Sequence, residues 1–465
     1  MYELSFLGAC GTVTGSKYHF KVRKTEWLID CGVFQGTQEI KQMNWQELPF
    51  DPEKLDAIIL THAHIDHSGF VPRMVKMGYS GPVYCTRGTA ALLQILWPDA
   101  GSLQEEEAHY ANKRQYTPHK PALPLFTEKD AKRALSLLRP THYGHKIELN
   151  PGIDFIFERV GHILGASFIQ LRIKRSRDEH HHWIFSGDVG RPTHPILKPP
   201  VTFPGADYLV VESTYGKRLH GMEDPAEILG DVVNETIRRG GVVLIPAFAV
   251  GRSQEILYYL RSLKLDGRIP EDLPIYIDSP MSVEALQLTR QFHREHNIEL
   301  RMLEGEGVEF LSGPHIHPIQ RVSDSKSLNH IKGRAVILSA SGMCNGGRIE
   351  HHLKHKLPDP RNTILFVGYQ AHGTKGRRIL EGEEAITIHG DEIPVKAQVR
   401  VINSISAHAD ADELLHWLNH DHFREPDVFV VHGEDEQREG FSDLLKSRFG
   451  WRATIPTLGQ RFRFP

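Results

Sequence analysis

The sequence predicts an α/β protein built from two parts, and two patterns support this. Apolar or alternating runs at residues 2–7 and 18–22 indicate that the chain begins with strands. Past Tyr208 the pattern changes, and strand-like runs such as 242–245 are followed by helix-like runs such as 252–263. Because such alternation is typical of a parallel sheet covered by helices, we expect such a sheet in the second part.

The first part is expected to hold further short strands and one mainly helical region. A helix should begin after Ser68, and residues 86–150 look mostly helical, with a polar interruption near 116–124. We expect His180, His181 and His182 to lie exposed in a hairpin turn after a charged stretch. The remaining strands of this part are predicted at 27–29, 55–60, 153–160, 168–173, 183–185 and 208–211.

The second part repeats the order of strand then helix, and the tail continues it. Gly/Ser-rich linkers are absent from the sequence, so we expect the domains to be joined directly. The predicted pairs of strand and helix are 275–277 with 283–293, 336–338 with 348–356, and 364–367 with 375–380. The tail is predicted as a strand at 399–402, a helix at 410–418 and a strand at 428–431.

Length and composition describe an ordinary globular protein. The 465 residues suffice for two or three domains, and the hydrophobic and charged fractions of 40% and 24% are typical of soluble chains. The sequence shows neither an apolar run that could span a bilayer nor a secretion signal. Its four cysteines are scattered, so a reducing cytoplasm is the expected location. With a net charge of -3, binding of a polyanion must depend on a local positive surface.

Three histidines and an aspartate crowd into the short segment after the predicted strand 55–60. They are His62, His64, Asp66 and His67. Neutral imidazole nitrogens and carboxylate oxygens are ligands that zinc prefers. Alternate residues of an extended segment point the same way, so His62 and His64 can bind one ion, and Asp66 and His67 can bind a second. A polar turn with chance histidines is the plain alternative, and so dense a cluster argues against it.

Three further candidate ligands each follow a predicted strand, at a turn that contains glycine. They are His162, Asp188 and His432. Taken singly, His162 could be a hydrogen-bonded core histidine and Asp188 could cap a turn. Because ligands gather at strand ends in sheet proteins, the repeated placement favours a shared metal centre.

Together these residues resemble the metallo-β-lactamase fold, and later motifs resemble its β-CASP branch of nucleic-acid nucleases. The HxHxDH string at 62–67 is accompanied by Asp30, His162 and Asp188, as in the wider fold. The branch adds Glu212, His408 and His432, and the resemblance extends over nearly the whole chain. Other strings that resemble the branch are Pro246–Arg252, Asp278–Met281, Ser341–Arg348, Gly368–Ala371 and Gly373–Arg377.

The resemblance implies an αββα sandwich that is interrupted by an inserted α/β domain. Residues 1–214 and 404–465 would form the metallo-β-lactamase domain, and residues 215–403 the inserted β-CASP domain with a parallel sheet flanked by helices. Two zinc ions are implied, with manganese or iron as alternatives. The first ion would bind His62, His64 and His162, the second Asp66, His67 and His432, and Asp188 would bridge them, while Asp30 orients the HxHxDH loop.

The resemblance also implies hydrolysis of a phosphodiester bond. A hydroxide held by the metal ions would attack phosphorus, with Asp66 and Asp188 as metal-binding catalytic carboxylates. His408 is the predicted general acid, and Glu212 is expected to orient it. Without the resemblance, a helix cap for His408 and a cap or turn carboxylate for Glu212 would be the simpler interpretations.

Contacts to phosphate are expected from the glycine-rich turns of the second part. Backbone N–H groups and basic side chains in such turns can hold phosphate, and glycine permits close approach of the backbone. A solvated helix face explains any one of these basic residues equally well. The predicted contacts are Ser341, Gly346, Gly347, Arg348, Lys375 and Arg377.

The leading hypothesis is a cytoplasmic ribonuclease that cuts single-stranded RNA, mainly internally, with exonuclease activity left open. A DNA nuclease of the crosslink-repair type is the first alternative, but the position matching His432 is usually valine in that branch. A non-catalytic RNA-processing scaffold is the second, although such scaffolds lose ligands and this sequence fills every ligand position. A small-molecule hydrolase would not need the inserted domain. No membrane partner is expected, and a homodimer is compatible with the sequence.

Overall fold

The structure is a computed structural model that describes residues 2–114, 120–176, 179–309, 311–368, 370–371, 373–419 and 425–465. Part of the predicted polar interruption near 116–124, and Tyr369 of the motif Gly368–Ala371, lie outside these ranges. The chain divides into two compact units. The sandwich unit comprises Met1–Thr193, Pro199–Leu219 and His408–Pro465, and the inserted unit comprises His194–Lys198 and His220–Ala407. The domain borders expected at 214 and 404 stay a prediction.

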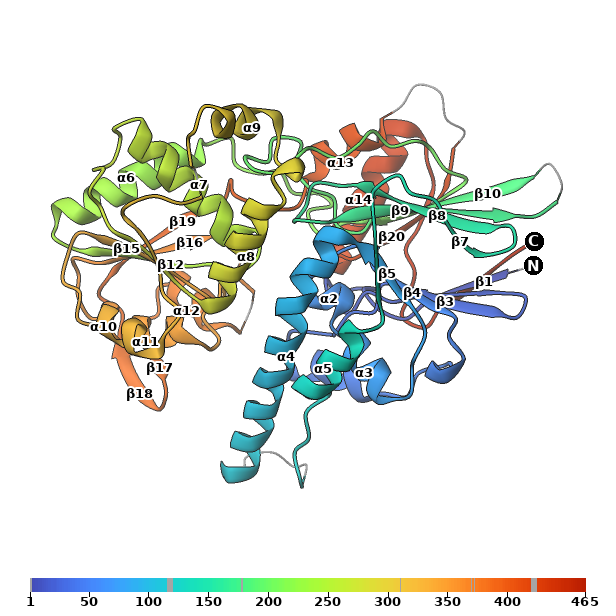
Figure 1. Cartoon of the computed structure of the whole chain (residues 1–465), viewed down its shortest axis with the longest axis horizontal. Coiled ribbons are helices and arrows are strands. Elements are labelled where there is room, and N and C mark those ends of the chain that lie inside the picture. The colour runs from blue at the N-terminus through green and yellow to red at the C-terminus, as the bar shows by residue number, and fades with distance from the viewer. Residues whose placement is uncertain are drawn as a thin grey trace. The chain divides into compact units, whose positions relative to one another are not determined.

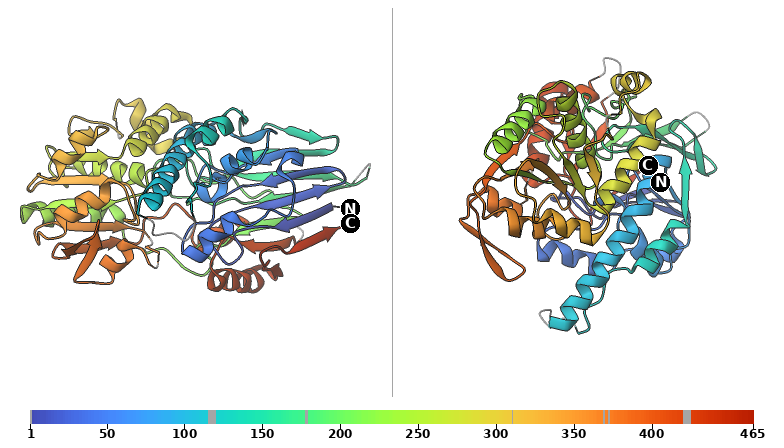
Figure 2. Two further views of the ribbon diagram at one scale, coloured as in Figure 1. Left: turned by 90° about the horizontal axis from the view of Figure 1, so that it is seen from below. Right: turned by 60° about the vertical axis from the view of Figure 1, so that its left-hand side comes forward.

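The sandwich unit contains two seven-stranded sheets (Figure 1). The first has the order β22 (Arg461–Phe464), β1 (Tyr2–Phe6), β2 (Tyr18–Val22), β3 (Thr25–Ile29), β4 (Ala57–Ile59), β5 (Val83–Thr86) and β6 (Leu138–Thr141). The second has the order β21 (Ala453–Thr454), β20 (Asp427–Val431), β11 (Tyr208–Glu212), β10 (His180–Phe185), β9 (Ser167–Lys174), β8 (Ile153–Arg159) and β7 (Ile147–Asn150). Because β1 pairs with β22, the two ends of the chain lie side by side (Figure 2).

An apolar, aromatic-rich core fills the space between the two sheets. One buried cluster joins Phe20 and Ile59 of the first sheet to Phe157 and Trp183 of the second. Alternate residues of β8 are buried, as expected for a strand with one face on the core. In β8 the alternation of the sequence therefore decides which face packs inside.

Helices cover the outer faces of the sandwich. The long helix α4 contacts β5 and β6, whereas α14 contacts β20 and β21. This arrangement is the αββα order that the resemblance implied (Figure 1). The helices of this unit are α1 (Gln38–Gln42), α2 (Ile65–Ser68), α3 (Val71–Lys76), α4 (Arg87–Arg114), α5 (Glu128–Leu135), α13 (Ala411–Leu418) and α14 (Asp435–Phe449).

One local expectation for this unit was incomplete and another was wrong. Residues 86–150 contain the edge strands β6 and β7 in addition to helices, because pairing with β5 and β8 stabilises short segments that lack a clear alternation. His180, His181 and His182 belong to β10 and not to a turn. The His181 side chain is buried, and its Nδ1 lies 2.6 Å from the Tyr2 hydroxyl oxygen.

The inserted unit is built on a six-stranded sheet in which every pairing is parallel. Its order is β14 (Ile316–Pro318), β13 (Ile275–Asp278), β15 (Ala335–Ser339), β12 (Val242–Pro246), β16 (Thr363–Val367) and β19 (Gln398–Ile402). The other elements are α6 (Pro225–Arg238), α7 (Arg252–Leu265), α8 (Pro280–Gln291), α9 (Ile298–Gly305), α10 (Val322–Leu328), α11 (Arg348–Lys356), α12 (Lys375–Leu380), and the hairpin of β17 (Ala385–Ile388) and β18 (Asp391–Pro394).

Both faces of this parallel sheet are covered, as the strand and helix alternation predicted. Val243 of β12 packs in one buried cluster with Leu257 of α7. Its neighbour Leu244 packs in another cluster with Leu353 of α11. Figure 1 shows α6 and α7 on one side of the sheet, and α10 to α12 on the other. In the described residues, no helix combines the length and apolar character needed to cross a membrane.

Candidate metal centre

The predicted ligands meet at one edge of the sandwich because the strands before them end there. Strands β10, β11 and β20 pair in parallel, and β8 runs the same way because β9 is antiparallel to both β8 and β10. Their carboxyl ends deliver His162, Asp188 and His432. In the first sheet, β3 and β4 are also parallel and deliver Asp30 and the segment 61–67.

Four ligand atoms form a first set, made by His62, His64, His162 and Asp188. His64 Nδ1 lies 3.1 Å from both His62 Nε2 and His162 Nε2. Asp188 Oδ2 lies 3.4 Å from His62 Nε2 and 3.5 Å from His162 Nε2. A tetrahedral zinc ion with bonds of ~2.0–2.1 Å holds its ligand atoms ~3.3 Å apart, so the set fits one such ion.

Asp66, His67 and His432 form a second set, which lies beside Oδ1 of Asp188. His67 Nε2 lies 3.0 Å from His432 Nε2 and 3.2 Å from Asp188 Oδ1. Asp66 Oδ2 lies 3.4 Å from His432 Nε2 and 3.8 Å from His67 Nε2. Asp188 thus presents one carboxylate oxygen to each set, and these donors also suit a divalent cation such as zinc.

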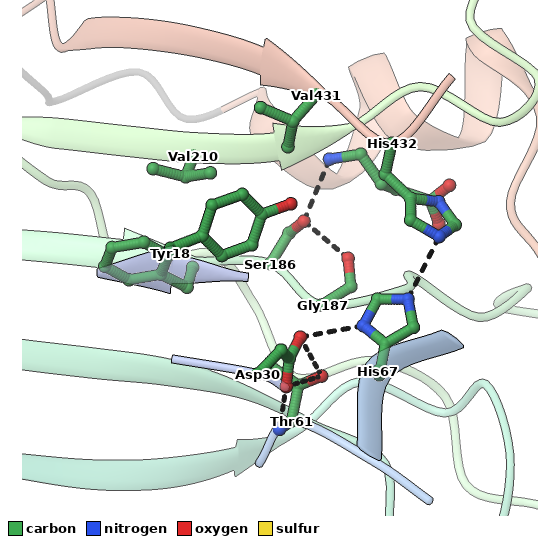
Figure 3. A pocket seen from close by; sticks show the side chains of 11 residues that line it. Tyr18, Asp30, Thr61, His67, Ser186, Gly187, Val210, Val431 and His432 are labelled. Carbon is green, nitrogen blue, oxygen red and sulfur yellow. Dashed lines mark hydrogen bonds and ion pairs between the residues drawn. The ribbon is translucent and has the colours of Figure 1, made fainter. Parts of the chain in front are cut away.

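Asp30 forms a hydrogen bond with the Nδ1 atom of His67, the ring nitrogen that does not face the second set (Figure 3). Its Oδ2 accepts a hydrogen bond of 2.7 Å from His67 Nδ1, and its Oδ1 accepts bonds of 2.8 and 3.0 Å from Thr61 N and Oγ1. With a proton on Nδ1, Nε2 is the nitrogen of His67 that faces the second set and can bind a metal ion.

Two threonines, which the sequence analysis did not single out, also lie next to the Nδ1 atom of a candidate ligand histidine. Thr61 Oγ1 lies 3.0 Å from His62 Nδ1, and Thr214 Oγ1 lies 3.1 Å from His432 Nδ1. Thr61 directly precedes the HxHxDH string, and Thr214 stands two residues after Glu212. However, a hydroxyl near a histidine in sequence is too common to carry a signal, and only the fold brings Thr214 to His432.

Close backbone packing and one left-handed residue hold the ligand loops together. A Cβ on Gly32 would lie 1.5 Å from the Asp66 carbonyl oxygen, and one on Gly190 would lie 2.1 Å from the Gly161 carbonyl. His432 has φ +49°, a conformation that costs a residue with a side chain roughly 1–3 kcal/mol. Such strain persists where the surrounding structure fixes the residue, as the neighbouring loops do here.

Burial keeps the histidines of the first set neutral. Burial lowers the pKa of His62 to about 3 and the pKa of His162 well below its ordinary value. For His67, burial acts in the same direction, but the carboxylates of Asp188 and Asp30 outweigh it and raise the pKa well above the ordinary value. Neutral imidazole is the form that binds metals, and the same carboxylates favour a bound cation.

His408 and Glu212 form a pair beside Asp188. His408 Nδ1 lies 3.2 Å from Glu212 Oε1, and His408 Nε2 lies 4.0 Å from Asp188 Oδ2. Burial lowers the pKa of His408, but the Glu212 carboxylate outweighs it and raises the pKa to about 9. The Glu212 carboxylate thus favours the protonated form of His408. The simpler interpretation of His408 as a helix cap does not hold, because Asp410 caps α13.

Glu212 is fully buried and also organises the backbone around it. Its Oε1 accepts a hydrogen bond of 2.6 Å from Val189 N, and its Oε2 accepts one of 3.2 Å from Thr214 N. The carboxylate therefore ties together the turn that carries Asp188, the segment after β11 and the His408 ring. This geometry allows Glu212 both to position His408 and to hold the turn at Val189.

The residues predicted to contact phosphate lie in the inserted unit, and their charges are paired there. The guanidinium of Arg348 donates to Asp278 Oδ1 at 2.7 Å and to the carbonyls of Ile319 and Gln320 at 3.0 and 2.6 Å. Lys375 Nζ lies 2.6 Å from Glu350, and Arg377 Nε lies 2.6 Å from Glu381.

The loop that holds the other predicted phosphate contacts runs from Ser341 to α11. Asn345 in this loop accepts a hydrogen bond from Lys375 N at 3.1 Å, which brings the loop to the start of α12. Gly346 is open, because a Cβ there would have nothing within 4 Å, whereas Gly347 is the N-cap of α11. Phosphate binding by Ser341, Gly346, Gly347 and the three basic residues stays a prediction.

Comparison with known proteins shows the family of the chain. Family models match residues 23–219 (metallo-beta-lactamase superfamily), 253–379 (Beta-Casp domain) and 392–456 (Zn-dependent metallo-hydrolase RNA specificity domain). Ribonuclease TTHA0252 of Thermus thermophilus is 38% identical over 459 residues, which cover 97% of this chain and 98% of the relative. Transcription termination factor FttA of Methanocaldococcus jannaschii is 32% identical over 469 residues, covering 98% of this chain and 70% of that protein.

A solved structure shares the fold along the full length. It is a protein of unknown function from Enterococcus faecalis V583, with a TM-score of 0.54, 14% identity and coverage of 99% of both chains. The family expected from the sequence is thus confirmed by matched models and by a relative of nearly equal length. The chain belongs to the β-CASP branch of the metallo-β-lactamase superfamily.

Proposed function

We propose that this chain is a zinc-dependent ribonuclease that hydrolyses phosphodiester bonds of single-stranded RNA, mainly by internal cuts. The observation that carries the proposal is the carboxylate of Asp188, which faces two full ligand sets and lies beside the pair of His408 and Glu212. The RNA specificity model over 392–456 supports RNA as the substrate, as do relatives named a ribonuclease and a transcription termination factor.

Two zinc ions would be held by the two ligand sets, with manganese or iron as alternatives. The donor atoms support this, because imidazole nitrogens and carboxylate oxygens bind all three metals and the spacing of the first set suits tetrahedral zinc. Ions bound there would lower the pKa of a water toward neutrality and stabilise charge on the phosphoryl oxygens. The first set is His62, His64 and His162, the second is Asp66, His67 and His432, and Asp188 is common to both.

The residues of the chain would position and move protons during the reaction. Glu212 Oε1 would accept a hydrogen bond from the protonated Nδ1 of His408, which leaves the Nε2–H of His408 to donate a proton to the departing oxygen. A bond forms between water oxygen and phosphorus while the bond from phosphorus to O3′ breaks. The products would therefore carry a 5′-phosphate and a 3′-hydroxyl. Asp30 keeps His67 in the tautomer that binds metal.

The remaining parts of the proposal concern domains and surroundings. We assign residues 1–214 and 404–465 to the metallo-β-lactamase domain and residues 215–403 to the inserted β-CASP domain. Four further points stay predictions: phosphate contacts from the inserted domain, a cytoplasmic location, a homodimer and an exonuclease activity. A DNA nuclease and a non-catalytic scaffold are the alternatives, and two full ligand sets argue against the scaffold.

A time course on labelled nucleic acid tests the proposal. RNA labelled at its 5′ or 3′ end, and DNA of matching sequence, would be incubated with the protein, with and without a chelator. We expect internal RNA fragments that disappear when metal is removed, and slower or no cleavage of DNA. Cleavage that resists the chelator, preferential cleavage of DNA, or a metal-loaded protein that cuts neither polymer would each overturn the proposal.

A further inference from the structure

Phe248 stands out at the carboxyl edge of the parallel sheet in the inserted unit. Its side chain is 48% exposed, although Ala247 and Ala249 on either side are only 1% and 9% exposed. It follows β12, a central strand whose residues are all buried. Ligands of parallel sheets collect at the carboxyl ends of the strands, so an exposed ring at this place can meet one.

Hydrogen bonds fix the backbone that carries Phe248. The Ser253 hydroxyl and backbone N–H donate to the Phe248 carbonyl at 2.8 and 3.1 Å. The buried Gln254 amide donates to the Ala249 carbonyl at 3.0 Å and accepts from Gly251 N at 2.7 Å. The ring is therefore presented by an ordered turn, which lowers the entropic cost of binding.

A glycine of the neighbouring strand end lies directly against this ring. A Cβ on Gly342, which follows β15, would approach two ring atoms of Phe248 to 3.1 and 3.2 Å. The Gly342 carbonyl accepts a hydrogen bond of 3.2 Å from the side chain of Gln370, which follows β16. The ends of three adjacent strands thus support Phe248 on one side and leave nearly half of its surface exposed.

The Phe248 ring lacks the cationic cover that the other exposed aromatic rings of the described residues have. In the described part of the chain, other exposed aromatic rings are already covered, because Arg73 lies over Trp45 and Arg114 over Tyr110, whereas no cation lies over Phe248. Nearby Arg252 is paired with Glu255 at 3.2 Å.

We propose that Phe248 is a stacking platform for one base of the single-stranded RNA. The inference rests on the proposed ribonuclease function and names a residue that would touch its substrate. Every nucleobase has a flat face that stacks on an aromatic ring, so the contact would be tolerant of sequence. It would add to affinity without depending on salt, unlike contacts between basic side chains and phosphate.

Binding of a fluorescent single-stranded RNA tests the platform, in a His408→Ala background that slows cleavage. Phe248→Ala should weaken binding roughly 5- to 150-fold, the range expected for loss of one stacked base. Phe248→Trp should bind at least as tightly as the parent, whereas Phe248→Leu should lose most of the affinity although it is apolar. The control Leu265→Ala, at a side chain with 47% exposure in the same unit, should bind as the parent does.

A scan with abasic RNA locates the stacked base. Removing one base at a time should weaken binding to the parent at one position, and Phe248→Ala should add no further loss there. Parent-like binding by Phe248→Ala or Phe248→Leu, or additive losses at every position, would overturn the platform. If the wild type cleaves RNA while these tests fail, the platform alone is wrong. If the wild type neither binds nor cleaves RNA, the proposed function itself is wrong.

Discussion

Asp188 Oδ1 lies 3.2 Å from His67 Nε2, while Asp188 Oδ2 lies 3.4 Å from His62 Nε2. One carboxylate thus touches a histidine of each ligand set with a different oxygen. The side chain is buried, so its negative charge must be balanced by the groups around it. Two divalent cations at the two sets would supply that balance, and this geometry leads to the first prediction.

Replacing Asp188 by Asn should disturb both ligand sets at once. The amide keeps the shape of the side chain, but it removes the negative charge and one of the two acceptor oxygens. We expect the zinc content to fall from two ions per chain to one or fewer, measured by elemental analysis of the purified protein. RNA cleavage should fall by about 10³-fold or more, because several kcal/mol of transition-state stabilisation depend on the metals. A variant with two tightly bound zinc ions and normal activity would contradict a bridging role.

Replacing His408 by Ala should separate catalysis from metal binding. A general acid contributes roughly 10²- to 10⁴-fold to a rate, so turnover should fall by that factor while zinc content stays at the wild-type level. The matched control is His416→Ala, because His416 is an exposed histidine on α13 of the same unit. Loss of zinc in parallel with activity would show that His408 acts as a ligand and not as an acid.

The pair of Glu212 and His408 predicts a change in the pH profile. The acid form of His408 is the active one, so the rate should fall as the pH rises through the pKa of His408. The Glu212 carboxylate raises that pKa, and a bound cation nearby would act in the opposite direction. Glu212→Gln should therefore move the basic limb of the profile to lower pH.

The control for this pH shift is Glu436→Gln, which removes a carboxylate that pairs at 2.6 Å with Lys217 on the surface of the same unit. It should leave the profile unchanged. An unshifted basic limb in a folded Glu212→Gln protein would argue that Glu212 serves only to hold the turn at Val189.

Replacing Asp30 by Asn should weaken metal binding without removing a ligand. Asp30 fixes the Nδ1 proton of His67, and loss of such a partner typically lowers metal affinity 10- to 100-fold, roughly. Competition with a chromophoric chelator would measure the change. Asp56→Asn is a suitable control, because Asp56 is exposed and accepts a hydrogen bond from Glu26 N. An unchanged metal affinity in the Asp30→Asn protein would show that His67 does not need the Asp30 carboxylate to bind metal.

Replacing Arg348 by Ala tests whether this residue serves the fold or the substrate. The buried Asp278 carboxylate would lose its 2.7 Å partner, so the free energy of unfolding should fall by roughly 2–5 kcal/mol in urea titrations. Arg377→Ala breaks a more exposed pair with Glu381 and should cost only about 0–1 kcal/mol. A stable Arg348→Ala protein with weaker, less salt-dependent RNA binding would instead favour the phosphate contact.

Much of the fold could be predicted because strands and helices with a buried face have a periodic pattern of apolar residues in the sequence. The alternating run at β8 and the strand and helix pairs of the inserted unit match the structure closely. The edge strands β6 and β7 could not be found in this way, since their stability comes from pairing with neighbours and not from a pattern of their own. The three histidines at 180–182 were misplaced for the same reason.

The sequence by itself determined the residue types of the candidate centre, because the ligand types and their positions after strands are local properties of the chain. The tertiary structure decided which oxygen of Asp188 faces which histidine, and which hydroxyls support the imidazoles. Those relations depend on parallel strands ending at one edge and on glycines that let loops touch, as Gly32 does at Asp66. The platform at Phe248 also needed the structure, because a sequence shows an apolar residue but not that its ring is exposed.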